Sequence, residues 1–343
     1  MNRLKHRLIF WVPFLIIAGI SIYYARSKGS VTIHGQTMGT TYSVKIVYQG
    51  SKPDSDFIKK RIDTILVDFN QSLSTYIPES EISKFNKSDN SSWFKVSNYF
   101  YDIVKSSKEL NKITKHFDPT VGPAINLWGF GEAGVWNNPP KDSELVKLKK
   151  YVGFEFIELH PSEYKIKKLH PKTSINLSAI AKGYGVDVVS NFLESIKAKN
   201  YLVEIGGEIR TRGSREDGTP WKLGIETPSN ESDSEKSIQK IINVGSLSLA
   251  TSGNYRNYFE KDGVRYSHII SPMTLKPVTH NTASVSVVHE SCGLADGWAT
   301  ALLALEPKEA LNLAEKHKIA AFFITHNNGR FDTFGTSEFD KLF

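Results

Sequence analysis

The chain alternates hydrophobic and polar positions in two different periods, which predict strands and helices respectively. Residues 31–48 contain TYSVKIV, whose period of two predicts a pair of strands. Residues 57–70 and 97–114 repeat apolar side chains at helical spacing and predict two amphipathic helices. Residues 118–140, by contrast, carry many prolines and glycines, so we expect a loop-rich segment there.

The rest of the chain continues this mixture of elements. The stretch INLSAIAKGYGVDVV opens as a strand at residue 175 and continues as a helix to about residue 198. Further helices are predicted after Leu294 and after Pro307, and a polar surface loop at residues 231–240. Strands are predicted in YVGFEFIEL, EYKIKKL, YLVEIGGEIRTRG, WKLGIET, residues 267–288 and IAAFFIT. Because strands and helices mix without regular alternation, the predicted fold class is α+β.

The first thirty residues have the composition of a membrane segment. Residues 8–25, LIFWVPFLIIAGISIYYA, are uncharged, and a helix of that length, at about 1.5 Å per residue, just crosses the core of a bilayer. The lysines and arginines before this run favour a cytoplasmic position for the N-terminus. We therefore predict an uncleaved membrane anchor in residues 1–29 and one domain in residues 30–343 outside the membrane. A cleaved signal peptide is the alternative.

Charge and cysteine content argue against several classes of protein. The net charge is +7, but five basic residues and no acidic residue precede residue 30, which leaves +2 for the rest of the chain. No basic stripe is interleaved with aromatic residues, so nucleic-acid binding is not expected. The single cysteine, Cys292, allows no internal disulfide, and no cysteine directly follows the apolar run to carry a lipid.

Lys182 stands among small residues, where nothing bulky covers it. Its neighbours include Ala179, Ala181 and Gly183. An ordinary surface lysine needs no such surroundings. We therefore interpret Lys182 as a lysine that meets a large, negatively charged ligand.

A carboxylate and a hydroxyl share one face of the helix predicted in LADGWATALLAL. Asp296 and Thr300 are four residues apart, and both are costly to bury among alanine, leucine and tryptophan without partners. In one interpretation Asp296 caps the helix and Thr300 bonds to its own backbone. In the other, the two oxygens bind a hard cation such as Mg²⁺, which prefers oxygen ligands and usually acts on phosphates.

Other motifs are weaker. GFGEAG, residues 129–134, has the spacing of a dinucleotide-binding loop, but Pro123 closely precedes it and Pro139 closely follows, so the required strand and helix are not expected. His268 ends a predicted strand, although a lone histidine is more often structural. Two adjacent glycines in VEIGGEIRTRG indicate the close approach of a backbone or a ligand.

Several motifs in order carry a family resemblance. The chain resembles the ApbE-like FAD:protein FMN transferases over nearly everything from Val31 onward. The resemblance implies a compact α+β fold of the tunnelling-fold kind and an Mg²⁺-dependent enzyme that splits FAD, transfers FMN through a phosphoester to a threonine of an acceptor protein, and releases AMP. The motifs are MGTTY, STY, FDPTVGPAINLWGFG, INLSAIAKGYGVD, VEIGGEIRTRG, SHIISP and ADGWATAL.

The resemblance also implies a role for individual residues. Ala179, through its carbonyl, would join Asp296 and Thr300 around the metal, and His268 would help the acceptor hydroxyl to lose its proton. Lys182 would neutralise charge on the pyrophosphate as well as contacting FAD. The residues expected to bind FAD are Met38, Tyr76, Phe117, Asp118, Pro119, Asn176, Lys182 and Ile270.

Departures from the family pattern and rival functions stay open at this point. Asn176 and Ser271 each stand where many members have aspartate. The same residues would serve an FAD pyrophosphatase, in which water replaces threonine, and a non-catalytic flavin-binding protein is a further alternative. The resemblance implies acceptors among the subunits of membrane redox complexes, of the Na⁺-translocating NADH:quinone reductase or Rnf type. The catalytic domain would then lie on the periplasmic side of a bacterial inner membrane.

Overall fold

The computed structural model describes residues 28–89, 91–131, 134, 138–228, 238–255, 258–327 and 329–342. The apolar run predicted to form the membrane anchor, residues 8–25, lies outside the described residues. Within them, no helix combines the length and the apolar character needed to cross a membrane. The anchor therefore stays a prediction.

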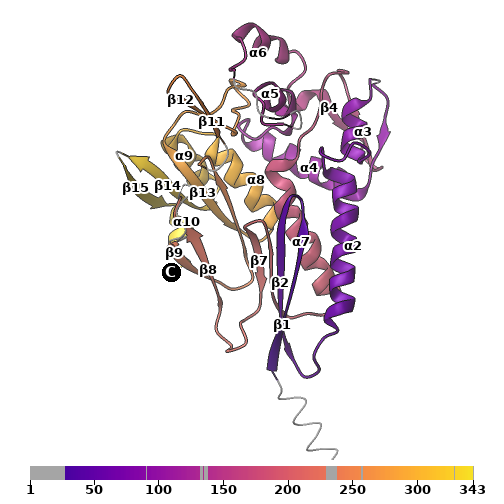
Figure 1. Ribbon diagram of the computed structural model, residues 1–343, viewed down its shortest axis with the longest axis vertical. Coiled ribbons are helices and arrows are strands. Elements are labelled where there is room, and N and C mark those ends of the chain that lie inside the picture. Colours follow the sequence, from indigo (N-terminus) through magenta and orange to yellow (C-terminus); the bar gives the residue numbers. More distant parts are fainter. Residues whose placement is uncertain are drawn as a thin grey trace, which may run out of the picture.

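A central antiparallel sheet forms the middle of the domain (Figure 1). All neighbouring strands in it pair antiparallel. Within the described residues eight strands build it, in the order β1 (Lys28–Thr37), β2 (Thr40–Gln49), β6 (Asn200–Ile205), β7 (Glu208–Arg212), β10 (Ser248–Gly253), β13 (Thr282–His289), β14 (Ala320–Asn327) and β15 (Arg330–Gly335).

Both faces of this sheet are covered, because successive side chains of a strand point to opposite faces. In β14, Ala321 and Phe323 belong to the core beneath helices, which include α7 (Ser178–Ser195) and α8 (Cys292–Leu303). Phe322 and Ile324 belong to a second core, beneath the hairpin of β8 (Trp221–Glu226) and β9 (Ile238–Val244). Strand β13 is accordingly buried along almost its whole length.

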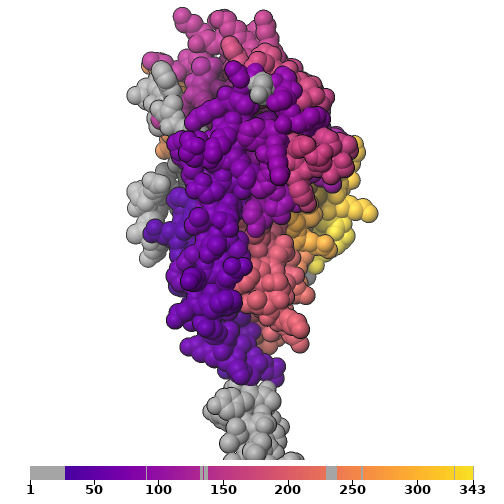
Figure 2. All heavy atoms as spheres, turned by 90° about the vertical axis from the view of Figure 1, so that its right-hand side faces the viewer, coloured from indigo at the N-terminus to yellow at the C-terminus, as the bar shows by residue number. Residues whose placement is uncertain are grey.

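Further helices extend the helical layer around α7 and α8. Helix α2 packs against β1 and α7, and it begins where Asp54 accepts hydrogen bonds from the backbone of Asp56 and Phe57. Seen from the right-hand side of Figure 1, the N-terminal strands and helices (indigo to purple) cover much of the surface (Figure 2). The helices of this layer are α2 (Ser55–Leu73), α3 (Glu81–Lys87), α4 (Asn98–Ile113) and α9 (Pro307–Lys316). Helix α10 (Ser337–Asp340) lies on the other face of the sheet, where Phe339 stacks on Phe322.

A smaller group of elements lies at the top of Figure 1, above the central sheet. It has its own apolar cluster, in which Trp128 donates a hydrogen bond of 2.8 Å to the carbonyl of Leu275. The elements around this end are η1 (Pro119–Val121), α5 (Gly122–Leu127), α6 (Asp142–Leu148), η2 (Phe154–Phe156), a sheet of β3 (Phe94–Lys95), β5 (Lys165–Lys168) and β4 (Ile157–Leu159), and the hairpin of β11 (Tyr258–Lys261) and β12 (Val264–Ser267).

The predicted α+β class and most long elements are confirmed, and several local predictions are wrong. Of the strand predicted in YVGFEFIEL, only residues 157–159 form a strand, after η2. Residues 119–127 are not loop but the short helices η1 and α5, because proline suits the first turn of a helix, where its missing N–H is not needed. Residues 175–177 form no strand ahead of α7. The glycine pair Gly206 and Gly207 forms the turn between β6 and β7 instead of lying within one strand.

Candidate active site

All predicted site residues except Met38 line one cavity of about 850 Å³. That volume is within the range of ligand pockets in proteins. The predicted residues that line it are Tyr76, Phe117, Asp118, Pro119, Asn176, Ala179, Lys182, His268, Ile270, Asp296 and Thr300. The structure thus brings together segments from the whole length of the domain.

Met38 lies at the turn between β1 and β2, beside this group. Met38 and Gly39 both have positive φ, at 51° and 70°, as a two-residue hairpin turn requires. The side chain of Met38 packs against α7, since a Cβ placed on Gly185 would lie 2.6 Å from Met38 Cε. Its predicted contact with FAD stays a prediction.

Helices α7 and α8 approach each other closely through glycine. A Cβ on Gly183 would lie 2.3 Å from the carbonyl oxygen of Cys292, so no other residue fits this contact without a shift of the backbone. The N–H of Gly183 donates a hydrogen bond of 3.0 Å to Asp296 Oδ2. Gly183 therefore serves the contact between the two helices as well as being a small neighbour of Lys182.

Lys182 forms a buried ion pair at the wall of the cavity. Its Nζ lies 2.6 Å from Glu208 Oε1, and the side chains are 35% and 2% exposed respectively. Burial lowers the pKa of Lys182, but the carboxylates of Asp296 and Glu208 more than offset this and raise the pKa above its ordinary value. Burial and the nearby Asp296 raise the pKa of Glu208 above its ordinary value, although Lys182 acts in the opposite direction. Burial raises the pKa of Asp296 to about 6, although Lys182 acts in the opposite direction. Two carboxylates thus share one lysine, an arrangement that favours a further cation.

The three oxygens predicted to bind the metal come from α7 and α8. The hydroxyl of Thr300 lies 3.4 Å from the carbonyl oxygen of Ala179 and shares a hydrogen bond of 2.9 Å with the hydroxyl of Ser252. Asp296 is one helical turn before Thr300, on the same face. A carboxylate, a carbonyl and a hydroxyl form the hard-oxygen donor set that Mg²⁺ prefers. The described residues hold no group of three or more His, Cys, Asp or Glu placed to bind a metal.

The alternative interpretation of Asp296 and Thr300 as local backbone partners is wrong. Helix α8 is capped by Ser291, whose hydroxyl accepts a hydrogen bond from the N–H of Leu294. Asp296 lies within the helix and is 3% exposed. Its carboxylate bonds instead to α7, and the hydroxyl of Thr300 contacts Ala179 of α7 and Ser252 of β10.

The segment around Asp118 is joined directly to the start of α7. The carbonyl of Pro119 accepts a hydrogen bond of 2.8 Å from the N–H of Asn176. Asp118 caps η1 by accepting from the N–H and the hydroxyl of Thr120, and burial raises the pKa of Asp118. Asn176 Oδ1 accepts from the N–H of Ser178 at 2.9 Å. Asparagine makes this bond as well as aspartate would, so the departure from the family pattern leaves the start of α7 intact.

An aromatic ring and a histidine complete the lining. Tyr76 is 71% exposed, so a face of its ring is accessible to a ligand. His268 directly follows β12, and its ring centroid lies 6.4 Å from that of Phe130. The lining of the cavity thus includes both an accessible aromatic surface and a group that can accept a proton.

Sequence reasoning missed many residues of the cavity, and two of them, Glu208 and Ser252, contact the predicted site residues directly. Glu208 directly follows the glycine pair, which did signal a close approach: a Cβ on Gly206 would lie 3.4 Å from Lys182 Cδ and 2.8 Å from Thr40 Cγ2. That signal could have directed attention to Glu208. No sequence pattern marks Ser252.

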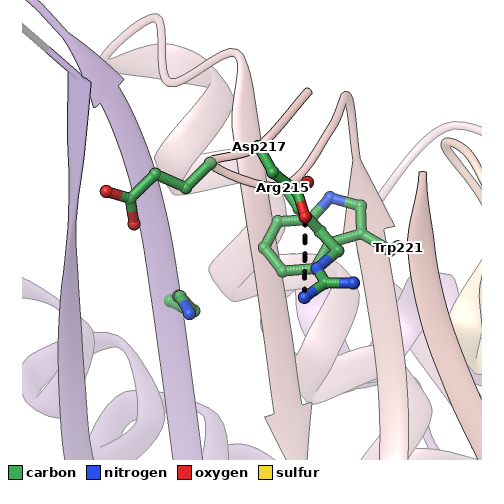
Figure 3. Close-up of a pocket in the computed structure, with 5 residues that line it drawn as sticks. Arg215, Asp217 and Trp221 are labelled. Atoms are coloured by element: carbon green, nitrogen blue, oxygen red, sulfur yellow. Dashed lines mark ion pairs between the residues drawn. The ribbon is translucent and has the colours of Figure 1, made fainter. Parts of the chain in front are cut away.

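A second cavity, of about 350 Å³, contains none of the predicted residues. It is lined by Lys45, Arg215, Glu216, Asp217 and Trp221, and Arg215 faces Asp217 across 3.9 Å (Figure 3). Two positive and two negative side chains cancel, so this cavity has no net charge with which to select an ion.

The fold and the first cavity together define an α+β protein with one large pocket lined by charged, polar and aromatic side chains. The model of the ApbE family matches residues 38–323, and the chain belongs to this family. An FAD:protein FMN transferase of Vibrio cholerae serotype O1 is 40% identical over 98% of each chain, and one of Haemophilus influenzae is 38% identical over 91% of each.

Solved structures agree with these sequence matches. The flavin transferase ApbE from Vibrio cholerae is 39% identical and has a TM-score of 0.84, covering 92% of this chain and all of that one. The apo form of the Pseudomonas stutzeri flavinyl transferase ApbE is 34% identical, also with a TM-score of 0.84, over 92% of this chain and 97% of its own. The predicted family and its mixed α and β fold are confirmed, as is the prediction that the chain is an enzyme.

Proposed function

We propose that this chain is an FAD:protein FMN transferase, which moves FMN from FAD to a threonine hydroxyl of an acceptor protein and releases AMP. One observation carries the proposal: a single cavity is lined by Lys182, Asp296, Thr300 and His268 and also by the exposed ring of Tyr76. The names of the relatives from Vibrio cholerae and Haemophilus influenzae support the same reaction.

In this proposal the chain binds FAD by its ring system and by its pyrophosphate. Tyr76 offers an aromatic face for a ring of FAD. Lys182 meets the pyrophosphate, whose negative charge increases as the bond to AMP breaks. Asp296, Thr300 and the carbonyl of Ala179 would hold Mg²⁺, and the bound ion would neutralise charge on the phosphate oxygens.

The transfer needs a proton acceptor near the attacking hydroxyl. The threonine oxygen forms a bond to the phosphorus of the FMN half, and the bond from that phosphorus to the bridging oxygen breaks. AMP leaves with the bridging oxygen and its electron pair. His268 takes the proton of the threonine hydroxyl, as a general base does. Its place in the lining of the cavity is consistent with this role.

The proposal extends to the location of the enzyme, and the composition of the N-terminal segment supports it. Residues 8–25 would anchor the chain in a bacterial inner membrane, and the basic residues before them would stay in the cytoplasm. The catalytic domain would then face the periplasm. Acceptors there would be subunits of membrane redox complexes of the Na⁺-translocating NADH:quinone reductase or Rnf type.

The full chain in detergent, incubated with FAD, MgCl₂ and such a subunit, tests the proposal. Mass spectrometry should show one FMN added to the acceptor, and chromatography an equal amount of AMP. An acceptor with its target threonine changed to valine is the matched control and should stay unmodified. Free FMN and AMP beside an unmodified acceptor would indicate a pyrophosphatase instead. Intact FAD that stays bound would indicate a flavin-binding protein without catalysis.

A further inference from the structure

We infer that Glu208 is a positioning residue of this enzyme, which fixes the ammonium group of Lys182 at the wall of the cavity where it meets the phosphates of FAD. The inference rests on the proposed function, because that function gives Lys182 its phosphate. Glu208 itself would not touch the reacting atoms. It would act on the reaction through Lys182.

The first observation is the difference in freedom between the two side chains. Glu208 is the first residue of β7, in register with Ile205 of β6, and its side chain is 2% exposed. Lys182 reaches it from α7 and is 35% exposed. A rigid, buried carboxylate therefore holds a long, partly exposed lysine at 2.6 Å.

The turn before Glu208 guides the stem of the same lysine. Gly206 has a φ of 60°, and a Cβ there would lie 3.4 Å from Lys182 Cδ. The turn thus contacts the aliphatic part of Lys182, while Glu208 binds its charged end. Both contacts come from one hairpin of the central sheet, which fixes the position of the lysine relative to α8 and Asp296.

The second observation is an incomplete set of hydrogen bonds. Within the part of the chain that the structure describes, Glu208 Oε2 is buried and has no hydrogen-bond partner. An ion pair kept only for stability would be expected to satisfy both oxygens, since a bare buried oxygen is costly. Lysine has three donors and Glu208 engages one of them. Lys182 can therefore donate to a phosphate and keep its bond to Glu208. If the ammonium group shifts, Glu208 Oε2 is available as a second acceptor.

A double-mutant cycle on the full chain tests the inference. Glu208→Gln keeps the shape and removes the charge, and we expect it to lower kcat/KM for transfer by roughly 10–100-fold, the usual cost of losing a supporting partner. In a Lys182→Ala background the same change should cost less than about twofold, because the residue through which Glu208 acts is gone. The affinity for FAD, measured by flavin fluorescence, should show the same coupling.

Glu194→Gln is the matched control. Like Glu208, Glu194 forms an ion pair, in this case at 2.7 Å from Arg212. It lies on α7, as Lys182 does, but it does not line the cavity. Its loss should change thermal stability and leave kcat/KM near the parent value.

Several outcomes would overturn the inference. An equal loss from Glu208→Gln in both backgrounds would mean that Glu208 acts without Lys182, and parental activity in the variant would mean that it does not act at all. If the glutamine variant does not fold, Glu208→Asp keeps the charge but shortens the reach, and parental activity of that variant would count against positioning. Absence of transfer by the parent enzyme on the same acceptor would instead refute the proposed function.

Discussion

Replacing Asp296 with asparagine should separate function from stability, because the two are expected to change in opposite directions. Asp296 is 3% exposed, and burial raises its pKa from 3.8 to about 6. A shift of that size means that keeping the carboxyl ionised costs the folded protein about 3 kcal/mol. Asparagine stays neutral and can still accept the hydrogen bond that Gly183 donates.

The sign of this effect depends on pH. Because the folded pKa lies above the unfolded one, the cost is absent below pH 3.8, grows from there to about pH 6 and is complete above pH 6. Without Mg²⁺, Asp296→Asn should therefore unfold at a higher temperature than the parent at pH 8, by up to about 3 kcal/mol of free energy of unfolding. The two proteins should converge towards pH 4.

The activity of the same variant should collapse. Mg²⁺ is usually held by one or two carboxylates, and Asp296 is the carboxylate in the proposed set. Losing even a supporting partner of a metal typically costs 10–100-fold, so AMP release should fall by more than about 100-fold and added Mg²⁺ should recover little. Parental AMP release at ordinary Mg²⁺ would refute the metal site. A lower melting temperature at pH 8 with activity intact in the folded fraction would show a structural role.

Three further predictions test other parts of the site. His268→Ala should slow transfer by about 10²–10⁴-fold with little change in the Kd for FAD; equal rates in variant and parent would leave His268 structural. Gly183→Ala should lower the free energy of unfolding by about 1–3 kcal/mol in urea titrations, because its Cβ meets Cys292. Gly245→Ala, where a Cβ meets nothing and φ is not positive, is the control, and an equal loss there would contradict the reasoning. A chain that begins at Lys28 should leave the membrane fraction and still release AMP from FAD, and a folded but inactive product would show that residues 1–27 contribute to catalysis.

Local sequence patterns correctly predicted the strands and helices whose apolar side chains repeat at a regular spacing within the segment itself. The strand pair at residues 31–48 and the helices at 57–70 and 97–114 follow from alternation or helical spacing alone. The errors at residues 119–127 and 175–177 have a different origin. There, proline and short apolar runs fit more than one conformation, and tertiary contacts such as the bond from Asn176 to Pro119 decide between them.

The site was predictable where its residues lie within recognisable motifs, and it was missed where a partner arrives by strand pairing. Lys182 and Asp296 were expected because their immediate neighbours are unusual. Glu208 looks like any strand glutamate until β7 pairs with β6 and places it against α7. Ser252 likewise meets Thr300 only because β10 packs on α8. Such contacts depend on the arrangement of the sheet, which no local pattern encodes.

The two helices that carry the proposed metal ligands are held together independently of any ligand. Asp187 of α7 accepts hydrogen bonds from the N–H groups of Cys292 and Gly293 at the start of α8, and from the hydroxyl of Ser291. With the bond from Gly183 to Asp296, these contacts fix α8 against α7 from its first residues onward. The oxygens proposed to bind the metal are therefore preorganised, so binding need not rearrange them. The freedom that remains belongs to the partly exposed side chains, and the inferred role of Glu208 is to limit that freedom at the lysine.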